Sequence, residues 1–409
     1  MPEKHILELG GRFEGSAMLN TRLDAQSGRL AELSGFTAED STKAYSRISA
    51  WPDYQVTPLH RLPGAAKHLG LAGLYCKDES RRLGMASFKA LGAVFASVSE
   101  VSELLAGRLG KPVSDLDLLQ GKYRKDLADT ALVCATDGNH GFSVANAARR
   151  MGCQARIYIP AGVSPGREQA LRNEGAEVIR IDGIYDEAYE AAEKDAAANP
   201  GAMMISDSAT PHYTKIPALC MTGYSVMARE FVEQLGEDLP THMMLTAGCG
   251  GLAAAMISSL HQLLGERAPK FIIVEPIKAD CVFASAVAGR STMVGGDLET
   301  IMGGLSCAAV SHLAWPTLES GAFGFLRMSD DAAVAAMRLL ARPRDGDPAI
   351  VAGETGGAGL AGILAICDDP EARKLFGLDG GAKVLVINCE GATDPEQYRR
   401  LVLAEHEAA

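Results

Sequence analysis

Short apolar runs alternate with segments of helical periodicity over most of the chain, from about residue 70 onward. Residues 130–135 form an almost unbroken apolar run, typical of a buried strand, and residues 141–152 follow with helical spacing and end at a glycine. The same succession of strand and helix recurs at residues 155–175 and 177–199. Repeated units of this length predict parallel sheets with helices on both faces.

The alternation returns in the second half of the chain, where the runs 243–248, 271–276 and 383–390 predict further strands. A less regular stretch, residues 201–222, separates them from the earlier units. We therefore expect an α/β protein of two domains, with ligands at the carboxyl ends of parallel strands. The expected parts are an N-terminal arm with part of the large domain (1–79), the small domain (80–200) and the remainder of the large domain (201–409).

Composition and charge argue against several partners and locations for this protein. The 409-residue chain has a formal net charge of −12 and no large cluster of lysine or arginine, so we expect no nucleic-acid partner. No apolar run reaches the roughly 20 residues of a membrane span, and the N-terminus lacks the layout of a signal peptide, which predicts a cytoplasmic protein with no membrane partner. The nine cysteines include no C-x-x-C pair and the nine histidines no H-x-x-x-H spacing, which favours free thiols and gives no support for a metal site.

A glycine-rich turn at residues 246–252 follows a predicted strand and opens a predicted helix. Small residues leave the backbone N–H groups accessible, and the helix N-terminus adds positive potential, so the turn is a candidate phosphate site. A tight turn that binds nothing is the alternative interpretation.

A second glycine-rich segment contains Gly357-x-Gly359-x-x-Gly362, which matches the dinucleotide-binding fingerprint. The acidic residue that the fingerprint requires would be Glu390, which lies 33 residues after Gly357 instead of the usual ~20. A nicotinamide-dependent oxidoreductase is therefore the weaker hypothesis, and close packing of a helix on a sheet explains the same glycines.

A third loop, residues 135–141, offers an acid, an amide and an imidazole between glycines: Asp137, Asn139 and His140. This set suits close contact with a polar ligand, although each residue alone is also typical of a helix cap or a turn.

Lys89 stands in an unusual position, directly after Phe88 and before the apolar run 90–96. An ammonium group there would be partly desolvated, which is costly unless the site uses the perturbation. Lys89 is therefore a candidate for chemistry.

Three of these segments resemble the motifs of the pyridoxal phosphate (PLP) enzymes of fold type II, the tryptophan synthase β family. Ser87-Phe88-Lys89 resembles their cofactor-lysine motif, residues 138–141 their GNHG loop, and residues 248–251 their phosphate loop. Within this family the motifs are most similar to those of the diaminopropionate ammonia-lyases. The matching segments are 57–70, 77–80, 87–92, 134–141, 182–192, 274–281, 300–307 and 389–395.

The resemblance implies a role for individual residues around a bound pyridoxal 5'-phosphate. Lys89 would form the Schiff base, and Phe88 would pack against the pyridine ring. Asn139 would hydrogen-bond the cofactor's 3′-oxygen, and Cys389 would face the ring nitrogen. The phosphate would be held by the backbone N–H groups of Gly248, Cys249, Gly250, Gly251 and Leu252. Side chains near the substrate would be Ser87, Thr136 and His140.

The same resemblance implies an α,β-elimination in a homodimer. Asp137 would be the base for a D-substrate and Asp207 the base for an L-substrate. The resulting aminoacrylate would hydrolyse to a 2-oxo acid and ammonia, so that 2,3-diaminopropionate would yield pyruvate and two ammonia molecules.

Several positions bear on the substrate. Leu91 stands where related threonine and serine dehydratases usually have an arginine, which favours diaminopropionate. Ala86-Ser87 and Thr210-Pro211 depart from the pattern of the diaminopropionate branch itself. An ammonia-lyase or dehydratase acting on serine, threonine or 3-hydroxyaspartate is the alternative, and a catalytically silent ligand-binding protein is the alternative from another class.

Overall fold

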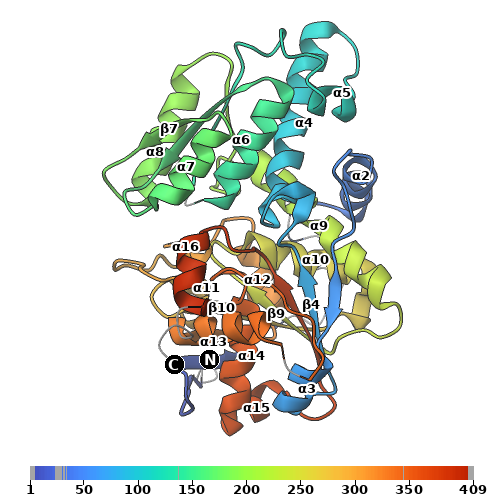
Figure 1. The fold of residues 1–409 in the computed structure, drawn as a ribbon, viewed down its shortest axis with the longest axis vertical. Coiled ribbons are helices and arrows are strands. Elements are labelled where there is room, and N and C mark those ends of the chain that lie inside the picture. The colour runs from blue at the N-terminus through green and yellow to red at the C-terminus, as the bar shows by residue number, and fades with distance from the viewer. Residues whose placement is uncertain are drawn as a thin grey trace. The chain divides into compact units, whose positions relative to one another are not determined.

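The computed structural model describes residues 5–23, 30, 33, 35–136, 138–343 and 345–403. The chain divides into two compact units. The large unit comprises Met1–Ala38, Val56–Arg81 and Met227–Ala409, and the small unit comprises Glu39–Gln55 and Arg82–Val226. Each unit contains one sheet with its own helices (Figure 1).

The small unit has a four-stranded, fully parallel sheet in the order β7-β6-β5-β8. Its strands are β5 (Ala131–Ala135), β6 (Gln154–Ile159), β7 (Glu177–Arg180) and β8 (Ala202–Met204). Its helical segments are α2 (Ala38–Ile48), η1 (Arg82–Gly84), α4 (Lys89–Leu109), α5 (Asp115–Leu119), α6 (Asn139–Met151), α7 (Pro165–Asn173), α8 (Tyr185–Ala198) and the start of α9 (Lys215–Leu235). The predicted succession of strands and helices between residues 130 and 199 is confirmed.

Helices α6 and α8 cover opposite faces of the small sheet. Tyr158 packs with the cluster formed by Val133 and Ala188 of α8. The neighbouring Ile157 lies against Gly141 of α6, where an added Cβ would come within 3.0 Å of its side chain. Because successive strand residues point to opposite faces, the two helices enclose the sheet, as a parallel sheet requires.

Helix α4 is a core helix of the small unit. Among the described residues it alone has the length and apolar composition that a membrane span would need. Residues 90–98 are all buried within the protein, which accounts for this apolar composition.

The large unit has an eight-stranded sheet in the order β1-β2-β11-β10-β9-β12-β4-β3. Its central strands run parallel, and antiparallel strands close both edges. The strands are β1 (Leu7–Glu8), β2 (Gly15–Leu19), β3 (Leu59–Arg61), β4 (Gly73–Asp78), β9 (His242–Thr246), β10 (Lys270–Pro276), β11 (Gly324–Met328) and β12 (Lys383–Asn388). Part of the predicted N-terminal arm is thus a pair of edge strands.

The helices of the large unit follow its strands along the chain. They are α3 (Pro63–Leu69), α10 (Gly251–Leu264), η2 (Gly265–Arg267), α11 (Cys281–Ala288), η3 (Gly303–Leu305), α12 (Trp315–Gly321), α13 (Asp330–Ala341), α14 (Ala358–Asp368), α15 (Pro370–Phe376), α16 (Pro395–Tyr398) and the π-helical turn η4 (Arg399–Leu403).

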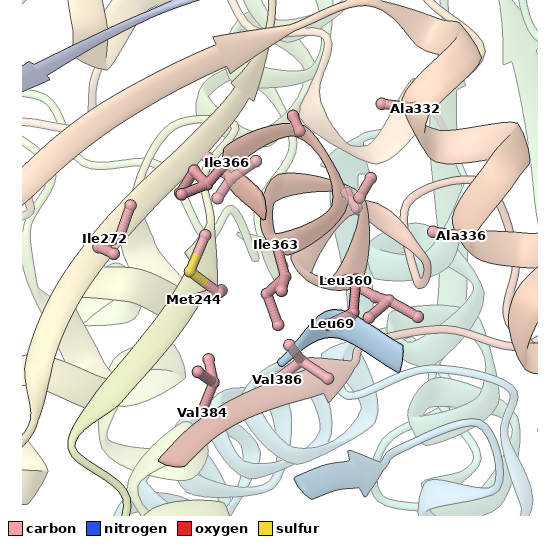
Figure 2. Packing of buried hydrophobic residues seen from close by; sticks show 14 of the residues in the cluster. Leu69, Met244, Ile272, Ala332, Ala336, Leu360, Ile363, Ile366, Val384 and Val386 are labelled. Carbon is pink, nitrogen blue, oxygen red and sulfur yellow. The ribbon is translucent and has the colours of Figure 1, made fainter. Parts of the chain in front are cut away.

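Helix α14 packs into the core of the large unit, where Leu360 and Ile363 lie among sheet residues such as Met244 and Val386 (Figure 2). A Cβ added at Gly362 would come within 2.8 Å of Val274 and 2.9 Å of Met244. The Gly-x-Gly-x-x-Gly segment also follows helix α13 and a loop, whereas the dinucleotide fingerprint follows a strand. Gly359 and Gly362 therefore serve helix–sheet packing, and Gly357 lies against Met337 of α13.

The small unit extends further along the chain than the predicted span 80–200. It also includes residues 39–55 and continues to residue 226. A close contact between α4 and α9 explains the extension: a Cβ added at Gly223 would lie 2.6 Å from the carbonyl oxygen of Leu91 and 2.9 Å from the Cα of Gly92. Such an approach of two backbones requires glycine, and it ties the first part of α9 to α4.

A fully buried ion pair lies in the large unit. The Nζ of Lys77 on β4 is 2.7 Å from the Oε2 of Glu230 on α9, and neither side chain is exposed. Lys77 also donates to the carbonyl oxygen of Thr57 (2.8 Å) and to Gln234 (2.9 Å). Removing the charge of one partner takes away the opposite charge that offsets the desolvation of the other.

Glu230→Gln is therefore expected to lower the free energy of unfolding by about 3–5 kcal/mol, measured by thermal or urea denaturation. Glu190→Gln is the matched control, because Glu190 forms a solvent-exposed pair with Lys194. That change should cost less than about 1 kcal/mol. Equal losses in the two variants would contradict the importance of the buried pair.

Candidate active site

Lys89 is the first residue of helix α4, in the small unit. Its side chain is 22% exposed, and its Nζ forms an ion pair and a hydrogen bond with the Oδ2 of Asp207. The Nζ also lies 5.5 Å from the ring centroid of Phe88. The lysine singled out in the sequence is thus a mostly enclosed amine that faces an aromatic ring and a carboxylate.

Asp207 follows strand β8, and its side chain is 12% exposed. Burial alone would raise the pKa of Asp207, but the charge and the hydrogen bond of Lys89, together with the other neighbouring polar groups, hold the pKa well below its usual range. Asp207 is therefore ionised at neutral pH in this arrangement. The site therefore places a proton acceptor, Asp207, in contact with an amine, Lys89.

The loop after strand β5 brings His140 to the same carboxylate. The Nδ1 of His140 lies 3.7 Å from the Oδ2 of Asp207 and has no hydrogen-bond partner. Its Nε2 is 2.8 Å from the carbonyl oxygen of Ile205, which can only accept, so Nε2 carries the proton. Burial lowers the pKa of His140, and its ring is neutral at neutral pH. Its Nδ1 is consequently an acceptor.

Thr136 fixes the shape of this loop. Its Oγ1 accepts hydrogen bonds from the N–H groups of Gly138 and Gly141, both at 3.0 Å. A Cβ added at Gly141 would lie 2.3 Å from Thr136, so glycine is required there. Asn139 begins helix α6 next to these residues. The other predicted acid, Asp137, lies outside the described residues.

Ser87 and Phe88 immediately precede Lys89 and are both buried. The Oγ of Ser87 accepts a hydrogen bond from the backbone N–H of Lys89 (3.3 Å). This bond helps to fix the start of α4. The structure therefore places Ser87, Phe88, Lys89, Thr136, Asn139, His140 and Asp207 together in the small unit.

The glycine-rich turn between β9 and α10 lies in the large unit. Gly250 has φ +87°, and a Cβ there would lie 2.6 Å from Leu318. A Cβ at Gly248 would come within 3.0 Å of the Sγ of Cys307. Gly251 and Leu252 open α10, whose first N–H groups have no partner within the helix. This set of backbone donors, with Cys249 between the glycines, is one that suits a phosphate group.

Cys389 follows strand β12 of the large unit and is buried. Its Sγ donates a hydrogen bond to the carbonyl oxygen of Thr355 at 3.4 Å. The position thus presents an uncharged sulfur.

Sequence reasoning missed Tyr224 of helix α9. Its ring lies 4.9 Å from that of Phe88, centroid to centroid, and its hydroxyl lies 3.5 Å from the Oδ2 of Asp207. The available signal was the pair of glycines, Gly92 and Gly223, inside two helical patterns, because such glycines often mark a close approach of two helices.

Comparison with known proteins gives a consistent result. A family model described as pyridoxal-phosphate dependent enzyme matches residues 50–390. The diaminopropionate ammonia-lyase of Escherichia coli K12 is 38% identical over 356 residues, which cover 85% of this chain and 87% of that protein. The chain belongs to the diaminopropionate ammonia-lyase family.

Solved structures of this family agree with the fold. The E. coli diaminopropionate ammonia-lyase in complex with D-serine has a TM-score of 0.85 and 32% identity, covering 97% of this chain and 99% of that chain. The same enzyme in complex with an aminoacrylate–PLP azomethine reaction intermediate has a TM-score of 0.83 and 32% identity, covering 99% of this chain and 100% of that one. The predicted fold type II and the predicted PLP cofactor are confirmed.

The residues present fit this cofactor. The ammonia-lyase offers an amine at Lys89, an aromatic ring beside it at Phe88, and in its large unit a glycine turn whose backbone N–H groups suit a phosphate. A Cβ at Gly248 would press on Cys307 and one at Gly250 on Leu318, so the turn requires glycine at both positions. Each of these groups has the chemistry that one part of a phosphorylated aldehyde requires.

Proposed function

We propose that this ammonia-lyase catalyses the α,β-elimination of 2,3-diaminopropionate, which with one water molecule gives pyruvate and two ammonia molecules. The contact between Lys89 and Asp207 carries the proposal. It places an amine that can bind the cofactor next to an ionised carboxylate. An elimination that begins with removal of an α-proton needs a base, and in a PLP enzyme also an amine that carries the cofactor. Support also comes from the family, whose E. coli member binds an aminoacrylate–PLP azomethine intermediate.

Pyridoxal phosphate, when bound, withdraws electrons from the substrate's α-carbon and so makes the α-proton easier to remove. Asp207 Oδ2 is assigned as the acceptor of this proton from the L-enantiomer. Loss of the positive charge at Lys89 would leave burial as the main influence on Asp207 and raise its pKa towards that of an effective base. Lys89 Nζ, in contact with Asp207, can then pass the proton to the departing amine.

Asp137 is proposed as the base for the D-enantiomer, on the family pattern alone, since it lies outside the described residues. Ser87, Thr136 and His140 are proposed to contact the substrate. The Oγ1 of Thr136 already accepts two N–H groups, so its own O–H is the group that can donate to a substrate oxygen. The Nδ1 of His140 can accept from a substrate ammonium.

The family pattern assigns cofactor contacts within each unit. In the large unit, the N–H groups of residues 248–252 would bind its phosphate, and Cys389 would be an uncharged partner of the ring nitrogen. In the small unit, Lys89 would carry it, Phe88 would pack against its ring and Asn139 would donate to its 3′-oxygen.

Serine is the second candidate substrate, because the E. coli enzyme forms a complex with D-serine. The test is to supply the purified enzyme with D- and L-2,3-diaminopropionate, D- and L-serine, threonine and 3-hydroxyaspartate, and to follow 2-oxo acid release. We expect kcat/KM for diaminopropionate to exceed that for serine by at least about tenfold, a difference of about 1.4 kcal/mol in transition-state binding. The Lys89→Ala variant controls for the slow reaction of free cofactor.

A higher kcat/KM for serine or 3-hydroxyaspartate would overturn the substrate assignment while keeping the reaction type. No 2-oxo acid from any of these amino acids, in a protein that shows the cofactor's visible absorbance, would overturn the enzymatic proposal in favour of the silent binding protein.

We further propose that the enzyme works in the cytoplasm as a homodimer, without a nucleic-acid or membrane partner. The nine cysteines are all free thiols, which suits a reducing compartment. The net charge of −12 disfavours binding to phosphate backbones. Light scattering coupled to size exclusion tests the dimer, which a mass near the 43.1 kDa of one chain would contradict.

A further inference from the structure

The backbone that carries Asp207 is fixed on two sides. On one side His140 donates from Nε2 to the carbonyl oxygen of Ile205 (2.8 Å). On the other, the hydroxyl of Tyr213 accepts from the N–H of Ser206 (3.0 Å) and donates to the carbonyl oxygen of Met204 (2.7 Å). The main freedom left to Asp207 is therefore the rotation of its own side chain.

The hydroxyl of Tyr224 reaches that side chain. It lies 3.5 Å from the Oδ2 of Asp207, the same oxygen that contacts Lys89. A tyrosine O–H can donate to a carboxylate, which only accepts when ionised. A donor at this place favours one rotamer of Asp207 and favours its charged form.

The position of Tyr224 is itself tightly constrained. The side chain is 1% exposed, and its ring packs on Phe88 at 4.9 Å with an angle of 57° between the planes. A Cβ at Gly92 would lie 2.4 Å from the Cε1 of Tyr224, so only glycine leaves room for this ring. Glycine at 92 and 223 lets α4 and α9 approach until the hydroxyl of Tyr224 meets the carboxylate.

We propose that Tyr224 is a positioning residue for Asp207, whose hydroxyl holds the carboxylate in the orientation that faces Lys89 and thereby sets its performance as the base for the L-enantiomer. The inference rests on the proposed function, because it takes Asp207 as that base. It assigns Tyr224 no contact with the substrate or the cofactor.

The titratable groups that interact with Asp207 include Lys89 of α4, Cys134 of β5, His140 of α6 and Tyr224 of α9. Burial raises the pKa of Cys134 and lowers that of His140, so both are neutral at neutral pH. Of these groups, only Lys89 is charged at neutral pH. The hydroxyl of Tyr224 therefore acts on a carboxylate that is paired with the ammonium of Lys89.

Tyr224→Phe tests the proposal, because it removes the hydroxyl and keeps the ring against Phe88. We expect kcat for L-2,3-diaminopropionate to fall by about 5- to 10-fold, and kcat for the D-enantiomer to change by less than about twofold. Loss of a donor to the carboxylate raises the pKa of Asp207, so the acid limb of the L-activity profile should move to higher pH. Tyr158→Phe is the control, because Tyr158 interacts with Asp195 in the same unit.

Tyr213→Phe separates positioning of the side chain from support of the backbone, since the hydroxyl of Tyr213 holds the backbone around Ser206. It should lower the thermal unfolding midpoint and affect both enantiomers alike. If Tyr224→Phe behaves in the same way, with no shift of the acid limb, the positioning role is overturned.

A double-mutant cycle with Asp207→Asn distinguishes failure of this inference from failure of the proposed function. If Tyr224 acts through Asp207, Tyr224→Phe should have no further effect on L-activity or on the pH dependence of the cofactor's visible absorbance in the Asp207→Asn background. Additive effects would overturn the inference alone. An Asp207→Asn variant without selective loss for the L-enantiomer would instead contradict the assigned base.

Discussion

Lys89→Arg is expected to abolish turnover while leaving the fold intact, with kcat reduced by more than about a thousandfold. Arginine keeps the positive charge and can keep the ion pair with Asp207, but its guanidinium does not deprotonate in proteins and cannot act as a nucleophilic amine. The variant therefore separates the electrostatic role of Lys89 from its chemical one. Pyruvate release from 2,3-diaminopropionate and the visible absorbance of the bound cofactor are the two measurements.

Lys89→Ala complements this test by removing the charge as well. Asp207 then loses the neighbour that holds its pKa low, and burial should raise that pKa. Lys194→Arg serves as the matched control, because Lys194 is exposed and pairs with Glu190 on the same helix, α8. Activity of Lys89→Arg within about tenfold of the parent enzyme would rule out Lys89 as the amine that carries the cofactor.

Local patterns in the sequence predict the candidate site because each motif depends on neighbours along the chain. Lys89 stood out because an apolar run follows it, and the structure shows that this run is the buried start of α4. The turn at residues 248–251 is a candidate because glycines between a strand and a helix leave backbone N–H groups accessible to an anion. The alternation of strands and helices likewise predicts the parallel sheet of the small unit.

Contacts between distant segments were beyond the reach of the sequence. Tyr224 lies 135 residues after Lys89 in the chain, and only the packing of Gly92 on α9 brings it to the carboxylate. The inclusion of residues 39–55 in the small unit has no local signature either. The hydrophobic pattern of a segment indicates which of its faces is buried. It does not indicate which distant segment packs on that face, and both of these features depend on that.

Site residues that serve structure and chemistry at once are the hardest to assign from sequence. Thr136 was predicted to contact the substrate, yet its oxygen accepts two backbone N–H groups that hold the loop in shape. His140 similarly uses Nε2 to fix the backbone at Ile205 and leaves only Nδ1 for a ligand. The arrangement predicts a rigid site, because most of its polar atoms already have a partner within the small unit.

Asp207→Asn is expected to reduce kcat for L-2,3-diaminopropionate by about 10²- to 10⁴-fold, the usual contribution of a general base. Asparagine has nearly the same shape, so the loop between β8 and α9 should keep its backbone contacts to His140 and Tyr213. The amide cannot accept the α-proton. Activity with the D-enantiomer should fall by less than about tenfold, because the proposed base for that substrate is a different residue.

Two controls accompany the comparison of the two enantiomers in Asp207→Asn. Asp347→Asn changes a buried acid of the large unit that accepts the N–H groups of Gly64 and Ala65 at the start of α3, so it should lower stability without separating the enantiomers. The visible absorbance of the cofactor in Asp207→Asn shows whether loss of the ion pair with Lys89 has weakened cofactor binding. If cofactor binding is intact and both enantiomers lose activity equally, Asp207 serves a step that both substrates share, and the proposed division between two bases fails.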